Sequence, residues 1–463
     1  MKTSILVCSL IAVLAAAAHI VGGVGAESTD PNLLAFENIS GQLRTFNRSG
    51  AVDLDNPFFQ DLGTNGRRCV TCHQPDAAWT ITPDNVRARF VATTGADPIF
   101  RSNDGSNCEG VDDINGNRAT AYSLLLSKGL IRVGIDVPGD AEFSVLSVDD
   151  PYGCGAPLQT VSVYRRPLPS TNLAFLSAVM WDGRESSATT TVVQDLAKQA
   201  NAATRGHAQA ARDLTADERR QIVVFETALF SAQGLDRDAG SLSSQGATGG
   251  AVRLSQQPFF IGINDPVGLN PTGAAFNSTA FMLFDAWAGL TSNDRDPYTE
   301  IRRSIARGQQ IFNTRRFTVQ GVNGLNGETF ASGVRVPESF NGTCTVCHDS
   351  PNVGNHSVKA PLNIGLADAS RRTDDLPLYT FVKKTTGETT QTTDPGRAMI
   401  TGKWADIGKF KGPILRGLAA RAPYFHNGSA ATPKDVVNFY DERFDIGLTP
   451  QEQADLTAFL RAL

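Results

Sequence analysis

The hydrophobic pattern is clearest at the end of the chain, where it predicts a helix. Thr449 is a good N-cap, Pro450 suits the first helical position, and Glu452 completes a capping box. An apolar stripe at helical spacing follows, made of Leu456, Phe459, Leu460 and Leu463. We expect this helix to bury one face against a core.

Two further segments show helical periodicity. Residues 298–314 place Ile301, Ile305, Ile311 and Phe312 near helical spacing, with arginines on the other faces. Residues 191–233 are rich in alanine, with Leu and Val at helical intervals, and also predict helix.

Polar stretches divide these helices. Residues 97–155 are rich in Asp, Asn, Gly and Pro and predict long loops, whereas residues 233–250 are rich in Gly, Ser and Ala and predict a flexible surface loop. We expect a domain boundary near residues 291–294. The length of 463 residues suits two or three domains.

The first residues predict a secretory signal peptide over residues 1–26. Lys2 precedes an apolar run at residues 5–18, and Val24-Gly25-Ala26 fits a small-x-small cleavage site. The alternative is a membrane anchor, but the run is shorter than the ~20 apolar residues that span a bilayer. We therefore expect a periplasmic or otherwise exported protein with no membrane span in its mature form.

Charge excludes one class of partner. The formal net charge is −5, and the chain has no block of basic residues. Nucleic acid is therefore not an expected partner.

Six cysteines follow the predicted signal peptide, and four of them form two Cys-x-x-Cys-His motifs. These are Cys69-Val70-Thr71-Cys72-His73 and Cys344-Thr345-Val346-Cys347-His348. Two cysteines at this spacing reach the two vinyl groups of one haem, and the adjacent histidine then lies under the iron. The alternative is a zinc site, but zinc does not require a histidine directly after each cysteine pair. The motifs predict two covalently bound c-type haems, with His73 and His348 as iron ligands.

The two remaining cysteines are Cys108 and Cys154. In an oxidising compartment they can form a disulfide, which would stabilise the fold by roughly 4 kcal/mol in the chain-entropy model. The alternative is a pair of free buried thiols.

Three strings in the chain resemble the dihaem cytochrome c peroxidases and their MauG-type relatives. They are Met180-Trp181-Asp182-Gly183-Arg184, Phe410-Lys411-Gly412-Pro413-Ile414-Leu415-Arg416 and Ala422-Pro423-Tyr424-Phe425-His426-Asn427-Gly428-Ser429. The resemblance implies a mainly α fold of two cytochrome c-like haem domains, with long loop insertions in the first. It assigns residues 27–292 to a domain with the peroxidatic haem and residues 293–463 to a domain with the electron-transfer haem.

The resemblance also implies a ligand for the second haem. In the peroxidases a methionine that follows the Pro-Tyr-Phe-His string ligates this haem, and in MauG-type proteins a tyrosine takes its place. Here the position is Tyr440, on a helix that starts at Thr432 and Pro433. Phenolate stabilises ferric iron relative to ferrous iron. The alternative is a tyrosine at the pocket rim with a hydrogen-bonded hydroxyl.

The first haem is the expected reaction site, because no histidine or methionine lies near the first motif until Met180. An open iron needs a distal acid/base. The family carries a glutamate for this role, but the matching place here is Asn201. His207 is the closest titratable substitute. Its alternatives are a sixth iron ligand or a surface histidine.

Three other residues take expected roles from the resemblance. Trp181 matches the tryptophan that relays electrons between the haems, with a core tryptophan as the alternative. Arg166 stands where the family has an interhaem calcium ligand, which leaves calcium uncertain. His426 is expected near the second haem, and we interpret His356 as a surface residue.

The leading hypothesis is thus a peroxidase-like enzyme that reduces hydrogen peroxide at the His73 haem, with His207 and Trp181 as its catalytic residues. Electrons would come from a small cytochrome or cupredoxin, or from an oxidisable partner protein as in MauG-type chemistry. The alternatives are a dihaem electron-transfer cytochrome without peroxidase activity, and a dihaem oxygenase.

Overall fold

The computed structural model describes residues 30–291 and 296–463. The predicted signal peptide and the domain boundary expected between residues 292 and 293 lie outside these residues. The helices are α2 Cys69–Cys72, α3 Pro83–Thr93, α4 Arg118–Ala121, α5 Ser123–Lys128, α6 Val192–Gly206, α7 Ala216–Ala228, α8 Ala251–Leu254, α9 Thr299–Thr314, α10 Ala398–Thr401, α11 Pro433–Phe444 and α12 Pro450–Arg461. None of the helices in the described ranges is long and apolar enough to cross a membrane.

Within residues 30–291 and 296–463 the strands form four antiparallel sheets. They are β1 Leu33–Asn38, β2 Gly41–Asn47, β3 Ile131–Asp136, β4 Phe143–Asp149, β5 Thr160–Arg165, β6 Leu229–Asp236, β7 Gly240–Ser241, β8 Phe317–Gln320, β9 Ser339–Gly342, β10 Leu378–Lys383 and β11 Thr389–Thr392. The sheet orders are β1-β2-β6-β7, β11-β10-β4, β3-β5 and β8-β9. The chain therefore combines the expected helices with more strand than its sequence pattern indicated.

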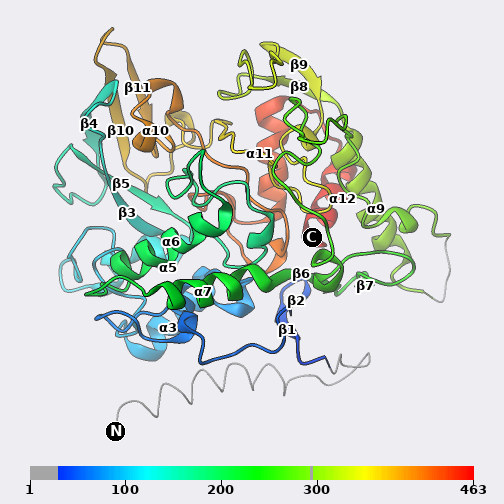
Figure 1. Cartoon of the computed structure of the whole chain (residues 1–463), viewed down its shortest axis with the longest axis horizontal. Helices are drawn as coiled ribbons and strands as arrows, with labels where there is room; N and C mark the ends of the chain where they lie inside the picture. Colours follow the sequence, from blue (N-terminus) through cyan, green and yellow to red (C-terminus); the bar gives the residue numbers. More distant parts are fainter. Residues whose placement is uncertain (1–29, 292–295) are drawn as a thin grey trace.

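The C-terminal helices α9, α11 and α12 pack together on one side of the molecule (Figure 1). The Thr449 side chain accepts a hydrogen bond from the backbone N–H of Glu452, so the predicted capping box of α12 is confirmed. The predicted apolar stripe of α12 is buried and packs on Ile305 and Phe312 of α9. Gly308 permits this crossing, because a Cβ there would lie 2.0 Å from the carbonyl oxygen of Asp455.

The segment predicted as one long helix at residues 191–233 is two helices and the start of a strand. α6 and α7 both begin with capping boxes, at Thr191 and Thr215. From Leu229 the chain continues as β6, which pairs with β2. The prediction of helix was wrong for residues 207–215, which connect α6 to α7, and for residues 229–233, whose partner strand lies far away in the sequence.

Residues 233–250 do not form the predicted flexible surface loop. β6 runs through Asp236, and Ala239 and Leu242 are fully buried. Leu242 belongs to the same core as Trp287 and α9. Long-range packing therefore orders a segment whose composition resembles that of a linker.

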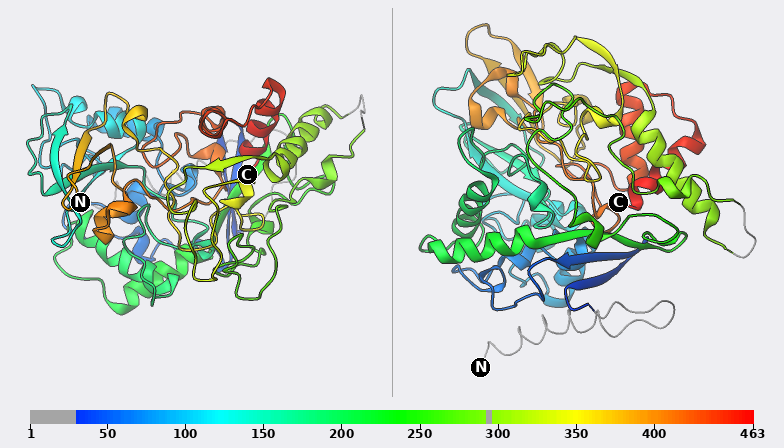
Figure 2. Two further views of the ribbon diagram at one scale, coloured as in Figure 1. Left: turned by 90° about the horizontal axis from the view of Figure 1, so that it is seen from above. Right: turned by 45° about the vertical axis from the view of Figure 1, so that its right-hand side comes forward.

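The segment at residues 97–155 is also more ordered than predicted. It contains α4, α5, β3 and β4, and β4 pairs with β10 from the C-terminal half of the chain. The sheets that include β3, β4 and β10 lie at the opposite end of the molecule from α9 and α12 (Figures 1 and 2). The prediction of long loops failed because strand partners distant in sequence supply the order.

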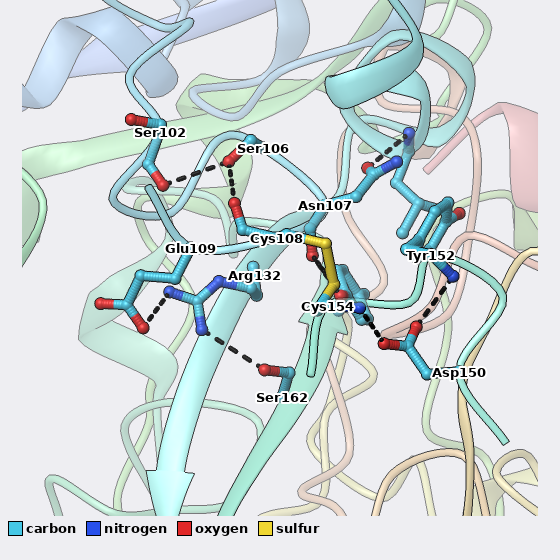
Figure 3. Close-up of a disulfide and its surroundings, with 12 residues drawn as sticks. Ser102, Ser106, Asn107, Cys108, Glu109, Arg132, Asp150, Tyr152, Cys154 and Ser162 are labelled. Atoms are coloured by element: carbon cyan, nitrogen blue, oxygen red, sulfur yellow. Dashed lines mark hydrogen bonds and ion pairs between the residues drawn. A yellow bond between two sulfur atoms is a disulfide. The ribbon is translucent and has the colours of Figure 1, made fainter. Parts of the chain in front are cut away.

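The predicted disulfide between Cys108 and Cys154 is present, with a Cα–Cα distance of 5.3 Å (Figure 3). Asp150 accepts hydrogen bonds from the backbone N–H groups of Tyr152 and Cys154, at 3.0 and 2.7 Å. Beside the disulfide, Arg132 of β3 forms an ion pair with Glu109 at 3.0 Å. The bridge thus ties the turn after β4 to the loop between α3 and α4.

Candidate functional site

Two large cavities each contain one Cys-x-x-Cys-His motif. Cys69, Cys72 and His73 line the first cavity. The second cavity is lined by the corresponding residues Cys344, Cys347 and His348. All four cysteines are free thiols. The structure therefore brings each set of predicted haem-binding residues together.

His73 is held by the backbone and by aromatic rings. Its Nδ1 lies 3.0 Å from the carbonyl oxygen of Trp79, and the ring of Phe58 lies 6.2 Å away between centroids. Burial lowers the pKa of His73 to about 4, although the Trp79 carbonyl favours the protonated form. A neutral imidazole that donates from Nδ1 keeps its Nε2 lone pair for a metal.

His348 is held in the same way. Its Nδ1 lies 2.7 Å from the carbonyl oxygen of Gly354, and Phe312 of α9 packs against its ring. Burial lowers the pKa of His348 against an opposing contribution from that carbonyl. Both motif histidines therefore present the same nitrogen for coordination.

Tyr440 of α11 lines the second cavity. Its ring centroid is 6.4 Å from that of His348, with an interplanar angle of 76°. Within the described chain its hydroxyl makes no hydrogen bond. Burial raises the pKa of this phenol, as do the nearby thiols of Cys347 and Cys344.

Trp181 lies in the wall of both cavities. Its Nε1 donates a hydrogen bond of 2.8 Å to the carbonyl oxygen of Arg166. On the side of the second cavity its ring meets the edge of His426, which stacks on Phe410 at 4.1 Å between centroids. The aromatic ring of Trp181 thus lies between the two cavities and contributes to the wall of each.

His207 caps the C-terminal end of α6 and lines the first cavity. Its side chain is 42% exposed, so it lies at the mouth of the cavity. Nδ1 of His207 bonds to one carboxylate oxygen of Asp104, whose other oxygen bonds to Arg67. Burial alone would raise the pKa of Asp104, but His207 and Arg67 lower it, so Asp104 is a carboxylate that orients His207.

Asn201, at the place of the family glutamate, does not line the first cavity. Its side-chain oxygen accepts a hydrogen bond of 2.8 Å from the backbone N–H of Leu214. Two other side chains that could bind a metal or carry a proton do line this cavity, Met180 and Glu226. Burial raises the pKa of Glu226 to about 7, and one of its carboxylate oxygens has no hydrogen-bond partner.

Three cationic side chains line both cavities: Arg166, Lys411 and Arg421. The guanidinium of Arg166 donates to the carbonyl oxygens of Ile81, Lys128 and Arg421. Backbone carbonyl oxygens from three separate segments are therefore satisfied by one side chain. No group of three or more His, Cys, Asp or Glu in the described ranges could hold a metal ion.

The two remaining histidines have different environments. His426 lines the second cavity, as expected, and burial lowers its pKa to about 4. His356 is only 4% exposed and lies 3.5 Å from Asp349, so its interpretation as a surface residue was wrong. The backbone carbonyl of His356 accepts a hydrogen bond from Ser177, so the segment is packed inside the molecule.

These residues fit two c-type haems. Each cavity combines two free thiols with a histidine whose Nε2 is available, and both walls are mostly apolar with a few cations for the haem carboxylates. The sequence pattern gave no role to four residues that the structure places in or beside the cavities: Asp104, Glu226, Lys411 and Arg421. Asp104 carries no local signal, because it lies 103 residues from His207 in a segment predicted as loop.

Comparison with known proteins gives relatives of one kind. No family model matches the chain. Cytochrome-c peroxidase IdrP1 of Denitromonas iodatirespirans is 34% identical over 139 residues, which is 26% of this chain and 36% of the relative. IdrP2 of the same organism is 33% identical over 132 residues, 26% of this chain and 36% of the relative. IdrP1 of Pseudomonas sp. (strain SCT) is 32% identical over 146 residues, 27% of this chain and 38% of the relative.

The chain thus spans little more than a third of the length of the curated relatives it matches. A solved structure of a MauG-like protein associated with microbial copper homeostasis aligns with 96% of this chain and 95% of that chain. The alignment has a TM-score of 0.38 and 16% sequence identity. Over about a quarter of its sequence, the chain is similar to cytochrome-c peroxidases.

Proposed function

We propose that the protein is an exported dihaem oxidoreductase that reduces hydrogen peroxide at the haem of the first cavity. Electrons would reach that haem through the haem of the second cavity. The observation that carries this proposal is the position of Trp181 in the wall of both cavities. Reduction of one hydrogen peroxide to water takes two electrons and two protons, so the site must conduct both.

Haem held by Cys69, Cys72 and His73, and by Cys344, Cys347 and His348, would supply the irons for peroxide reduction and for electron storage. Burial keeps both imidazoles neutral, and the two Nδ1 hydrogen bonds orient them. The division into haem units at residues 27–292 and 293–463 is part of the same proposal.

In this proposal Tyr440 would be a ligand of the haem in the second cavity. Support comes from its hydroxyl, which has no hydrogen-bond partner in the described chain and lies in the same cavity as His348. A tyrosine ligand favours ferric iron. His348 and Tyr440 would together hold the second haem, which would supply electron exchange, and the first cavity would supply the site for peroxide.

His207 moves the proton at the first cavity. Asp104 holds Nδ1 of His207, which leaves Nε2 free to take a proton from one peroxide oxygen and return it to the other. The exposed position of His207 at the cavity mouth allows exchange with solvent protons. Trp181, with its N–H bonded to the Arg166 carbonyl, relays electrons between the cavities.

The electron donor in this proposal is a small redox protein, a cytochrome or a cupredoxin, or an oxidisable residue of a partner protein. Export to the periplasm is supported by the disulfide between Cys108 and Cys154, since disulfides persist in oxidising compartments.

Peroxide titration of the purified diferric protein tests the proposal. Stopped-flow absorption should show changes at both haems without prior reduction, because the second haem shares the oxidising equivalents. In a Trp181→Phe variant the change at the first haem should remain, and the change at the second haem should slow. A Trp404→Phe variant, outside the residues that line either cavity, is the matched control.

Electron paramagnetic resonance separates the alternatives. An open first haem predicts a high-spin ferric signal. If both ferric haems are low-spin and peroxide changes neither, the protein is an electron-transfer cytochrome. Consumption of dioxygen with a hydrocarbon substrate, without peroxide, would instead identify an oxygenase.

A further inference from the structure

The wall between the cavities carries positive charge that no acidic side chain neutralises. Arg166, Lys411 and Arg421 line both cavities, and none of them forms an ion pair within the described residues. The neighbouring Arg165 is different, because it is paired with Asp182 and with Asp394. These three unpaired cations, which line both cavities, are what we call the shared wall.

The shared wall is held rigidly by backbone contacts. Arg166 is 5% exposed, and its guanidinium is fixed by three carbonyl oxygens at 2.6 to 3.0 Å. Arg421 donates to the carbonyl oxygen of Ile414 at 2.6 Å, and its Nε has no partner. The backbone N–H of Lys411 donates to the carbonyl oxygen of Trp181 at 2.9 Å, whereas its side-chain amine contacts no acceptor in the described chain.

Buried cations without a counter-charge are unfavourable, because burial removes their hydration. Burial lowers the pKa of Lys411 to about 7 and the pKa of Arg421 to about 10. An anion on the wall would favour the charged forms of both side chains. Each c-type haem carries two carboxylates, and the wall faces the two cavities in which haems would lie.

We propose that Arg166, Lys411 and Arg421 form one anion-binding wall that takes carboxylates of both haems and sets both reduction potentials together. This inference rests on the proposed function for the presence of two haems. A positive charge stabilises an iron that has gained an electron, so it raises the reduction potential. Lys411 is the positioning residue of the wall, because its amine is the group that the protein leaves without a partner.

Potentiometric titration of the purified diferric protein tests the wall, with the absorption of both haems as the readout. In Lys411→Gln both midpoint potentials should shift to more negative values. In Lys411→Arg, which retains the charge, both should stay near their original values. Lys403→Gln, which changes an exposed lysine, is the matched control and should shift neither potential.

A shift of only one potential in Lys411→Gln, or of neither, contradicts a shared wall. Arg421→Gln gives an independent test at the same wall, and it should also shift both potentials in the negative direction. If Lys411→Gln loses haem, the Arg421→Gln result decides. The shared-wall proposal can be refuted while peroxide reduction persists. If the unmodified protein lacks two haems, the proposed function is refuted instead.

Discussion

Replacement of Asp104 by Asn tests how the first cavity handles protons. Asp104 is 6% exposed and binds Nδ1 of His207 with one oxygen and Arg67 with the other. The substitution keeps the shape of the side chain and the acceptor for Arg67, but removes the negative charge next to the imidazole. It therefore acts on the histidine with little change in packing.

The magnitude follows from the lost charge-assisted hydrogen bond. A hydrogen bond to a charged group contributes about 1.5–3 kcal/mol. If that contribution is made when His207 holds the transferred proton, Asp104→Asn should slow peroxide cleavage roughly 10- to 150-fold. The affinity of the protein for haem should not change, because Asp104 does not contact either motif histidine.

The assay is the second-order rate constant for the reaction of the diferric protein with hydrogen peroxide, measured by stopped flow across pH. His207→Gln should produce a similar loss, and the double variant should be no slower than His207→Gln alone. Asp113→Asn, an exposed carboxylate in the same segment, is the control. An unchanged rate constant and pH profile in Asp104→Asn would refute the role of His207 as acid/base.

Three other predictions concern single contacts. Tyr440→Phe should convert the second haem to a high-spin ferric state, as measured by electron paramagnetic resonance, and should raise its potential in a potentiometric titration; an unchanged second haem would exclude ligation by the phenol. Replacement of Cys108 and Cys154 by Ser opens a bridge with a sequence separation of 46 and should reduce the free energy of unfolding by about 4 kcal/mol in urea. Burial alone would raise the pKa of Asp182, but Arg165 and Arg184 lower it from 3.8 to about 2. Because the folded pKa is depressed, this stabilisation of about 2 kcal/mol is present above pH 4 and is lost as pH falls from about 4 to 2; the slope of Tm against pH in this window should be smaller in Asp182→Asn.

Local sequence signals predicted much of the site and part of the fold. The two haem motifs, the capping box at Thr449 and the start of α11 at Thr432 are contained within a few residues each, so spacing alone reveals them. The disulfide followed from cysteine counting, since Cys108 and Cys154 were the pair left over. Burial of His356 had no such signal, because the segments that cover it come from elsewhere in the chain.

The sequence by itself determined the two Cys-x-x-Cys-His motifs and the starts of α11 and α12, because each depends on neighbours within one or two turns. The tertiary structure decided the strand at residues 229–233, the contact of Asp104 with His207, and the meeting of Arg166 with Arg421 across 255 positions. These features depend on partners that are distant in the chain. Their positions follow from how the hydrophobic cores pack, and periodicity within one segment does not predict that packing.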